Sequence, residues 1–133
     1  MSDVRVIRPH ERDATTAQTP GMARVAGVSA ATCGSLGVWM GEVTTEPYFR
    51  SGAHHHGGVE SAIYVVHGRM RMRWGDRLQR SIDAGPGDFV FVPAHVVHQE
   101  MSVSDERLVL ILARGAQENV VVNIDLPAEV LAG

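Results

Sequence analysis

Hydrophobic and polar residues alternate along most of this chain with a period of two. The clearest run spans residues 62–74, and over residues 69–74 apolar side chains at even positions alternate with arginines at odd ones. Such a period places apolar side chains on one face of a β-strand and charged ones on the other. The run therefore predicts a strand buried on one face. The alternating residues are Met70, Met72 and Trp74 on one side, and Arg69, Arg71 and Arg73 on the other.

Other segments rich in Val, Ile and Phe have the length of strands and are separated by Gly, Pro, Asp and Ser. No segment has the 3.6-residue period of a long helix. Many short strands with regular turns indicate an all-β sandwich or barrel. The further strand candidates are 4–8, 22–28, 36–44, 78–83, 88–92, 99–103, 107–114 and 119–124.

A length of 133 residues fits a single domain with a core of its own. We expect residues 1–21 to form an N-terminal strand and arm, residues 22–126 the barrel, and residues 127–133 a C-terminal tail. Short helical turns are expected at 15–18 and at 127–131, the second opened by a proline.

The composition of the chain excludes several classes of function and partner. The 12 basic residues are all arginine, against 15 acidic ones, so the formal charge of −3 argues against nucleic acid as a partner. The absence of lysine excludes Schiff-base chemistry, and the single Cys33 excludes an internal disulfide or a cysteine-based zinc cluster. The N-terminus does not resemble a signal peptide, and no apolar run is long enough to cross a bilayer. We expect a cytoplasmic protein with no membrane partner.

Three consecutive histidines form the most distinctive feature of the sequence. Within a strand, His54 and His56 share one face and His55 takes the other, and Glu60 has the parity of the first two. Two imidazoles and a carboxylate turned into a barrel form a site for a divalent transition metal. Burying such a group without an ion to pair with it would be unfavourable. We therefore predict His54, His56 and Glu60 as metal ligands.

A second motif lies at residues 87–98, where Gly-Asp precedes a short strand, a proline turn and a histidine five residues after the proline. Together, the two motifs resemble those of the cupin superfamily. The first is His-x-His followed by Glu60 and by a strand-closing Gly68. The resemblance implies a cupin-type double-stranded β-helix, or jelly-roll barrel, with His98 as a fourth metal ligand. The motifs span residues 47–102, and the strand pattern extends the likeness over nearly the whole chain.

The chain departs from the cupin motifs at four places. Tyr48 and His95 stand where the family has glycine, and Ser102 stands where asparagine is typical. Seven residues separate Glu60 from Gly68 where six are usual, which a β-bulge would accommodate. Glu60 is therefore the ligand that the motif supports least, and without it the site would be a three-histidine centre.

The pocket around the metal should be mostly apolar, with Arg50 and Gln99 as polar groups that orient a ligand. Glu100 has the opposite parity to Gln99, so one of the two should face inward. Such a pocket suits a small, partly hydrophobic molecule that carries oxygen. The predicted substrate-pocket residues are Tyr48, Arg50, Tyr64, Met70, Met72, Trp74, Phe91 and Gln99.

Four protein ligands leave open positions on a six-coordinate ion for a substrate. The donor set admits Fe, Mn, Co, Ni, Cu or Zn as the single cofactor ion, and Glu60 could also detach to act as a base. The resemblance implies an oxygenase, decarboxylase, isomerase, cyclase or lyase, or a non-catalytic member. The complete ligand set favours an enzyme of the oxygenase or isomerase/cyclase type. The alternative is a non-catalytic module that binds a metal or a small molecule.

The sequence also predicts self-association. Ile63 and Val65 oppose the Glu60 face, and residues 120–122 are apolar on both faces. Left uncovered, these side chains would form an exposed apolar patch. We therefore expect a homodimer in which the N-terminal strand lies against the sheet of the partner.

Overall fold

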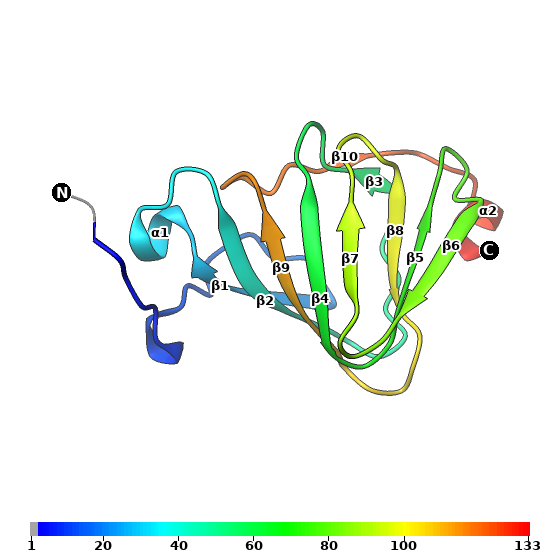
Figure 1. Ribbon diagram of the computed structural model, residues 1–133. Coiled ribbons are helices and arrows are strands. Elements are labelled where there is room, and N and C mark those ends of the chain that lie inside the picture. The colour runs from blue at the N-terminus through cyan, green and yellow to red at the C-terminus, as the bar shows by residue number, and fades with distance from the viewer. Residues whose placement is uncertain (1–2) are drawn as a thin grey trace.

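The chain folds into two antiparallel five-stranded sheets that face each other (Figure 1). The computed structural model describes residues 3–133. The order of the first sheet is β1-β2-β9-β4-β7, and that of the second is β10-β3-β8-β5-β6. This confirms the predicted all-β cupin-type fold. The strands are β1 (Met22–Val28), β2 (Trp39–Thr45), β3 (His54–His55), β4 (Ser61–His67), β5 (Met70–Trp74), β6 (Arg80–Ala84), β7 (Phe89–Val92), β8 (His98–Ser102), β9 (Leu108–Arg114) and β10 (Val122–Asn123).

Helical structure is confined to short segments at the periphery: η1 (Pro9–Glu11), α1 (Ala30–Cys33) and α2 (Ala128–Ala132). In Figure 1, α1 lies beside β1 and β2 at one end of the molecule, and α2 lies beside β6 at the other. Pro127 is the N-cap of α2, close to the predicted position. None of the helices among residues 3–133 has the length and apolar character needed to cross a membrane.

Most strands form where the alternation predicts them, and β1 coincides with the predicted 22–28. The N-terminal segment 4–8 does not form the expected strand: Val4 is fully exposed, and the segment pairs with no described strand. Residues 15–18 form no helical turn because Asp13 accepts hydrogen bonds from the backbone and side chain of Thr15 and holds a local turn instead. Met1 and Ser2, part of the predicted arm, lie outside the described residues.

The core lies between the two sheets, and β4 contributes Ile63 and Val65 to it, 3% and 0% exposed. This corrects the expectation that these two residues face outward and Tyr64 inward. That expectation extends the alternation of side chains from His56 through residues 57–60 into β4. However, β3 and β4 belong to different sheets, and residues 57–60 form a turn and a loop between them. Side chains alternate between two faces only within one continuous strand, so the pattern of β3 does not predict which residues of β4 face inward.

Gly68 ends β4, and its residue type is required there. Its φ is +86°, and a Cβ at this position would lie 2.6 Å from the carbonyl oxygen of Arg107. Only glycine accepts both the left-handed backbone and this close approach. The chain then enters β5, which places Met70 and Met72 in the core as expected. The turn therefore transfers the chain from the first sheet into β5 of the second, which pairs with β8.

Candidate metal centre

The histidines of the two motifs meet in the second sheet. His54 on β3 lies directly opposite His98 on β8, and His56 follows immediately after β3. The ring centroids of His54 and His98 are 4.4 Å apart, and those of His56 and His98 are 5.0 Å apart. Glu100 lies two residues after His98 on β8 and turns to the same side. One potential ligand atom from each of these four residues lies within 4.8 Å of the others.

Each of the three imidazoles places Nδ1 against a backbone carbonyl oxygen. A carbonyl only accepts, so Nδ1 carries the hydrogen and Nε2 is left with a free lone pair. Nε2 of His98 is buried and has no hydrogen-bond partner among residues 3–133. Its contact with Glu100 Oε1 is long, at 3.5 Å. The acceptors are Gly52 O, 3.1 Å from His54, Val120 O, 2.7 Å from His56, and Val96 O, 2.9 Å from His98.

Electrostatics favours neutral His54 and His56 beside an ionised Glu100. Burial lowers the pKa of His54 and of His56, so both are neutral near pH 7. Burial raises the pKa of Glu100, but the close contact and charge of His98, with smaller effects of the other two histidines, outweigh it and bring the pKa to about 2. Burial likewise lowers the pKa of His98, and Glu100 outweighs it, so that this pKa is raised overall.

These residues fit a divalent transition metal. Three Nε2 lone pairs and one carboxylate form the mixed nitrogen and oxygen donor set that such ions accept. The backbone acceptors on Nδ1 fix the tautomer and the ring orientation, as outer-shell partners of metal-bound histidines do. The orphaned, buried Nε2 of His98 is the atom that most requires a partner. An ion held by His54, His56, His98 and Glu100 would satisfy it.

The predicted ligand Glu60 does not join this cluster. It is exposed and precedes β4, whereas Glu100 occupies the fourth position. The cluster therefore contains Glu100 where Glu60 was predicted as the fourth ligand, and the catalytic role expected of Glu60 stays a prediction. The cause is the broken parity across residues 57–60. The alternation that places His98 inward also places Glu100 inward, since both lie on β8. This signal was available in the sequence, because either Gln99 or Glu100 was expected to face in.

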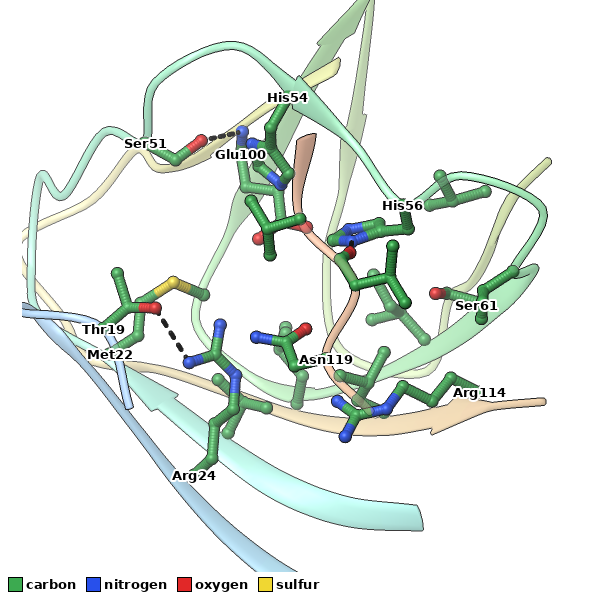
Figure 2. A pocket seen from close by; sticks show the side chains of 18 of the residues that line it. Thr19, Met22, Arg24, Ser51, His54, His56, Ser61, Glu100, Arg114 and Asn119 are labelled. Atoms are coloured by element: carbon green, nitrogen blue, oxygen red, sulfur yellow. Dashed lines mark hydrogen bonds between the residues drawn. The ribbon is translucent and has the colours of Figure 1, made fainter. Parts of the chain in front are cut away.

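A cavity of about 310 Å³ adjoins the cluster between the two sheets. His54, His56 and Glu100 line one side of it, and Figure 2 shows them turned toward the same space. Apolar side chains such as Val43 and Leu110 form part of its wall. Its polar lining further includes Arg24, Arg114, Asn119, Thr19, Ser51 and Ser61.

The predicted pocket residues are distributed over several places. Arg50 lines the main cavity while its Nη1 donates to Leu131 O at 2.7 Å. Met72, Trp74 and Phe91 line a second cavity of about 220 Å³, which His98 also borders. These three residues therefore lie near His98, in a cavity separate from the main one.

The other four predicted pocket residues line neither cavity. Met70 lies in the core, 1% exposed, and Tyr48 is 69% exposed in a loop. Tyr64 faces outward on β4, where its ring stacks against Phe89 with centroids 4.8 Å apart. Gln99 is fully buried, but its amide donates to Ser51 O and Leu131 O, away from the metal cluster.

Sequence reasoning missed Arg24 and Arg114 as cavity residues. They lie on β1 and β9, far from both motifs in the chain, and the sheet order alone brings β1 and β9 across from β3 and β8. No local pattern marks an arginine that points inward. The two-residue period could have suggested it for Arg114, since Leu108 and Leu110 on the same strand are buried.

Comparison with known proteins agrees with this architecture. The family profile of the cupin domain matches residues 41–114, more than half of the 133 residues. This chain belongs to the cupin family. The matched part contains His54, His56, His98 and Glu100. No curated protein matches the sequence.

Solved cupin structures resemble this one in fold. The oxalate decarboxylase of Bacillus subtilis, which has Mn(II) centres, is 21% identical with a TM-score of 0.70 over 92% of this chain and 34% of its own. KdgF from Halomonas sp. is 19% identical, with a TM-score of 0.68 over 87% of this chain and 97% of its own. Peruvianin-I, a cysteine peptidase from Thevetia peruviana latex, is 13% identical, with a TM-score of 0.69 over 90% of this chain and 77% of its own.

These likenesses establish the fold and leave the reaction open. A decarboxylase and a peptidase share the fold, so activity has to be argued from the site. This cupin spans only about a third of the oxalate decarboxylase chain that it resembles. The functional argument therefore rests on the metal cluster and the cavity beside it.

Proposed function

We propose that this cupin binds one divalent transition metal through Nε2 of His54, His56 and His98 and the carboxylate of Glu100. We further propose that it is an enzyme acting on a small, oxygen-bearing substrate in the adjoining cavity. One observation carries the proposal: the four donor groups converge within 4.8 Å, and the buried Nε2 of His98 has no protein partner among the described residues.

When bound, such an ion supplies Lewis-acid polarisation of a coordinated oxygen, or redox chemistry if it is Fe, Mn or Cu. The protein orients the three imidazoles, keeps those of His54 and His56 neutral, and offers the substrate a cavity between the sheets. The low pKa of Glu100 suits a ligand better than a general base, which works best with a pKa near the working pH. We therefore assign Glu100 to metal binding and not to proton transfer.

The reaction class that we propose is an oxygenase or an isomerase/cyclase. A cavity directly beside the cluster supports an enzyme, because a substrate there could reach the open positions of the ion. The Mn(II) centres of the Bacillus subtilis oxalate decarboxylase support a redox-capable metal. The alternative is a non-catalytic cupin that binds a metal or a small molecule through the same residues.

Metal analysis of protein purified without added metal tests the centre itself. We expect about one equivalent of a transition metal in the wild type, because one set of four donors is present. His98→Ala should lose most of it, whereas the matched variant His55→Ala should keep it, because His55 points out of the cluster and accepts a hydrogen bond from Gly57 N. An empty wild type that takes up no added metal, or equal metal contents in the two variants, would refute the centre.

Substrate panels separate the enzyme from the binding module. Oxygen consumption by the metal-loaded protein with diketones and flavonols would identify an oxygenase, and product analysis of the same mixtures would identify an isomerase or cyclase. If no compound is turned over while one of them still raises the melting temperature, the non-catalytic reading is correct.

We also propose that the protein is a homodimer, on different grounds from the sequence argument. Ile63 and Val65 are buried, but Tyr64, Val66, Phe89 and Phe91 point outward from β4 and β7. We call these four residues the β4–β7 outer face. Phe89 is 80% and Phe91 60% exposed, which is an unusual amount of aromatic surface to leave in water. The N-terminal segment 4–8, which exposes Val4 and Val6, is available to lie against a partner.

A further inference from the structure

Two buried or half-buried arginines face the cavity from the first sheet, opposite the metal cluster. Arg114 on β9 is 6% exposed, and Arg24 on β1 is half-buried. Both line the main cavity. Figure 2 shows their guanidinium groups directed into it, with the amide of Asn119 between them in that view and His54, His56 and Glu100 on the far side. The cavity thus has a metal-binding end and a cationic end.

Each guanidinium is positioned by the protein but retains an unused donor. Arg114 donates from Nε to Ala116 O at 3.0 Å and from Nη2 to Gln117 O at 2.8 Å, and it stacks over Trp39 at 4.0 Å from the ring centroid. Its Nη1 is buried without a partner. Arg24 donates from Nη1 to Thr19 Oγ1 at 2.9 Å, and its Nε is buried without a partner.

No acidic side chain of residues 3–133 forms an ion pair with either arginine. Burial lowers the pKa of Arg24, and burial together with the charge of Arg24 lowers the pKa of Arg114 to about 10. Both therefore remain cationic near pH 7. Unpaired buried charges are unfavourable unless a ligand compensates them. An anion in the cavity would supply both the missing charge and the missing hydrogen-bond acceptors.

The neighbouring residues favour an anion that also reaches the metal. Glu100 is the carboxylate nearest the centre, and in the proposed function its charge is used by the ion. Of the remaining charged residues that line the cavity, Arg24, Arg50 and Arg114 outnumber the exposed Glu118. Asn119, whose side chain forms no hydrogen bond with another described residue, adds an amide at the cationic end. Apolar side chains such as Leu110 also line the cavity.

We propose that Arg24 and Arg114 bind a carboxylate of the substrate, so that the substrate class of this cupin is a small, partly apolar organic acid. The carboxylate faces the two guanidinium groups at the cationic end of the cavity, and another oxygen of the same molecule is left to face the metal end. This deepens the proposed function and rests on it for the reaction, but the anion site itself is formed by the arginines alone.

Calorimetric titration tests the anion site directly. The probes are malonate, succinate and glutarate, each paired with its uncharged diamide of nearly the same shape. They are titrated into the metal-free protein and into the protein loaded with Mn(II). We expect at least one diacid to bind about tenfold or more tightly than its diamide, as charge-assisted hydrogen bonds to arginine predict. Equal binding of every diacid and its diamide, or no binding of either, would overturn the proposal.

Substitutions then assign the preference to the arginines. Arg24→Gln should weaken diacid binding about tenfold and leave diamide binding within twofold, and Arg24→Lys should recover part of the loss. Arg80→Gln removes an exposed arginine on β6 and should change neither affinity. A loss of diacid binding that is equal in Arg80→Gln, or no loss in Arg24→Gln, contradicts the assignment. Arg114 also donates hydrogen bonds to the backbone carbonyls of Ala116 and Gln117, and its replacement would remove these structural contacts as well. The test therefore uses Arg24.

A separate Mn(II) titration distinguishes this failure from failure of the proposed function. If Mn(II) binds but diacids and diamides do not differ, the metal centre stands and the anion site is refuted. If Mn(II) does not bind but diacid binding still depends on Arg24, the anion site stands and Mn(II) is excluded as the ion of the centre. The metal analysis described above then decides whether the centre exists. Arg24→Gln itself should keep its Mn(II) affinity within twofold of wild type, since Arg24 is not among the four donors.

Discussion

At the scale of single residues, each histidine of the centre serves the fold and the ligand at once. Nδ1 of His54, His56 and His98 is held by a backbone oxygen, so the ring cannot rotate without losing that hydrogen bond. The three Nε2 atoms are therefore preorganised before any ion arrives. Preorganisation of this kind reduces the ordering cost of binding. The position of the fourth donor decides whether the site is a three-histidine or a mixed centre.

Replacing each candidate carboxylate separately by an amide shows which one is the fourth donor. Glu100→Gln should weaken transition-metal binding tenfold or more, because an anionic donor within the cluster becomes a neutral amide. Glu60→Gln should leave the metal affinity unchanged, because Glu60 is exposed outside the cluster. Competition titration against a chelating indicator dye measures both constants. A larger loss in the Glu60 variant would restore the original assignment.

The histidines were predictable from the sequence because each motif lies in or next to one strand. The i, i+2 spacing of His54 and His56 needs no knowledge of the rest of the fold. Glu60 failed because its assignment required the alternation to continue through a turn into another sheet. Glu100 was accessible to the same reasoning applied within β8. Arg24 depends on a contact between strands distant in sequence, which the order of residues does not reveal.

At the scale of elements, β8 separates two tasks on its two faces. His98 and Glu100 face the cavity, while Gln99 faces away and ties the strand to other segments. The Gln99 amide donates to Ser51 O at 3.0 Å and to Leu131 O at 3.1 Å, and it accepts from Arg73 Nη1 at 2.9 Å. Helix α2, which carries Leu131, is thereby fastened to the back of the metal-binding strand. The buried amide is a structural group, which explains why it is absent from the pocket.

Gln99→Ala should therefore affect stability and not metal binding. It leaves the partners of a fully buried amide without hydrogen bonds and opens a small void, at a cost of roughly 2–4 kcal/mol in the free energy of unfolding. Urea denaturation of the metal-free protein measures this cost, and the dye competition measures the metal affinity, which should stay within threefold of wild type. If Gln99→Ala lost its metal affinity but kept its stability, Gln99 would be part of the metal site.

Strand boundaries followed the sequence for most of the chain and departed from it in the segments near the two termini. The edge strand β1 coincides with its predicted range, and β4 and β9 form close to where the alternation predicts them. Segments 4–8 and 119–124 are also rich in Val and Ile, but the first forms no strand and the second only the short β10. Strand propensity alone does not supply a pairing partner. The fold class was thus readable from the pattern, and the periphery was not.

At the scale of the whole molecule, the buried charges make stability depend on pH. The folded pKa of Glu100 is about 2, below its ordinary value of 4.5. A depressed carboxylate pKa adds stability that is present above the unfolded pKa and is lost as the pH falls toward the folded pKa. For Glu100 this contribution is on the order of 3 kcal/mol, lost between about pH 5 and pH 2.

Comparison with a variant isolates this contribution from all other titrating groups. The difference in unfolding free energy between metal-free wild type and Glu100→Gln should be largest near pH 5 and shrink toward zero near pH 2. Urea denaturation at a series of pH values measures it. A difference that stays constant from pH 5 to pH 2 would show that the ionised carboxylate does not stabilise the fold.

The β4–β7 outer face leads to the last expectation for the whole molecule. β7 is an edge strand, and the ring of its exposed Phe89 contacts that of Tyr64 at an angle of 52°, which gives an aromatic surface. If this surface is the dimer interface, wild-type protein should scatter light as a dimer at micromolar concentration, and Phe89→Ser should scatter as a monomer. Ile82→Ser removes an apolar side chain of 44% exposure from the opposite edge strand β6 and should remain dimeric. Phe89 is 80% exposed, so its loss should leave the folded chain intact. A monomeric wild type would mean that the aromatic surface has another partner, and dissociation of the Ile82 variant alone would move the interface to β6.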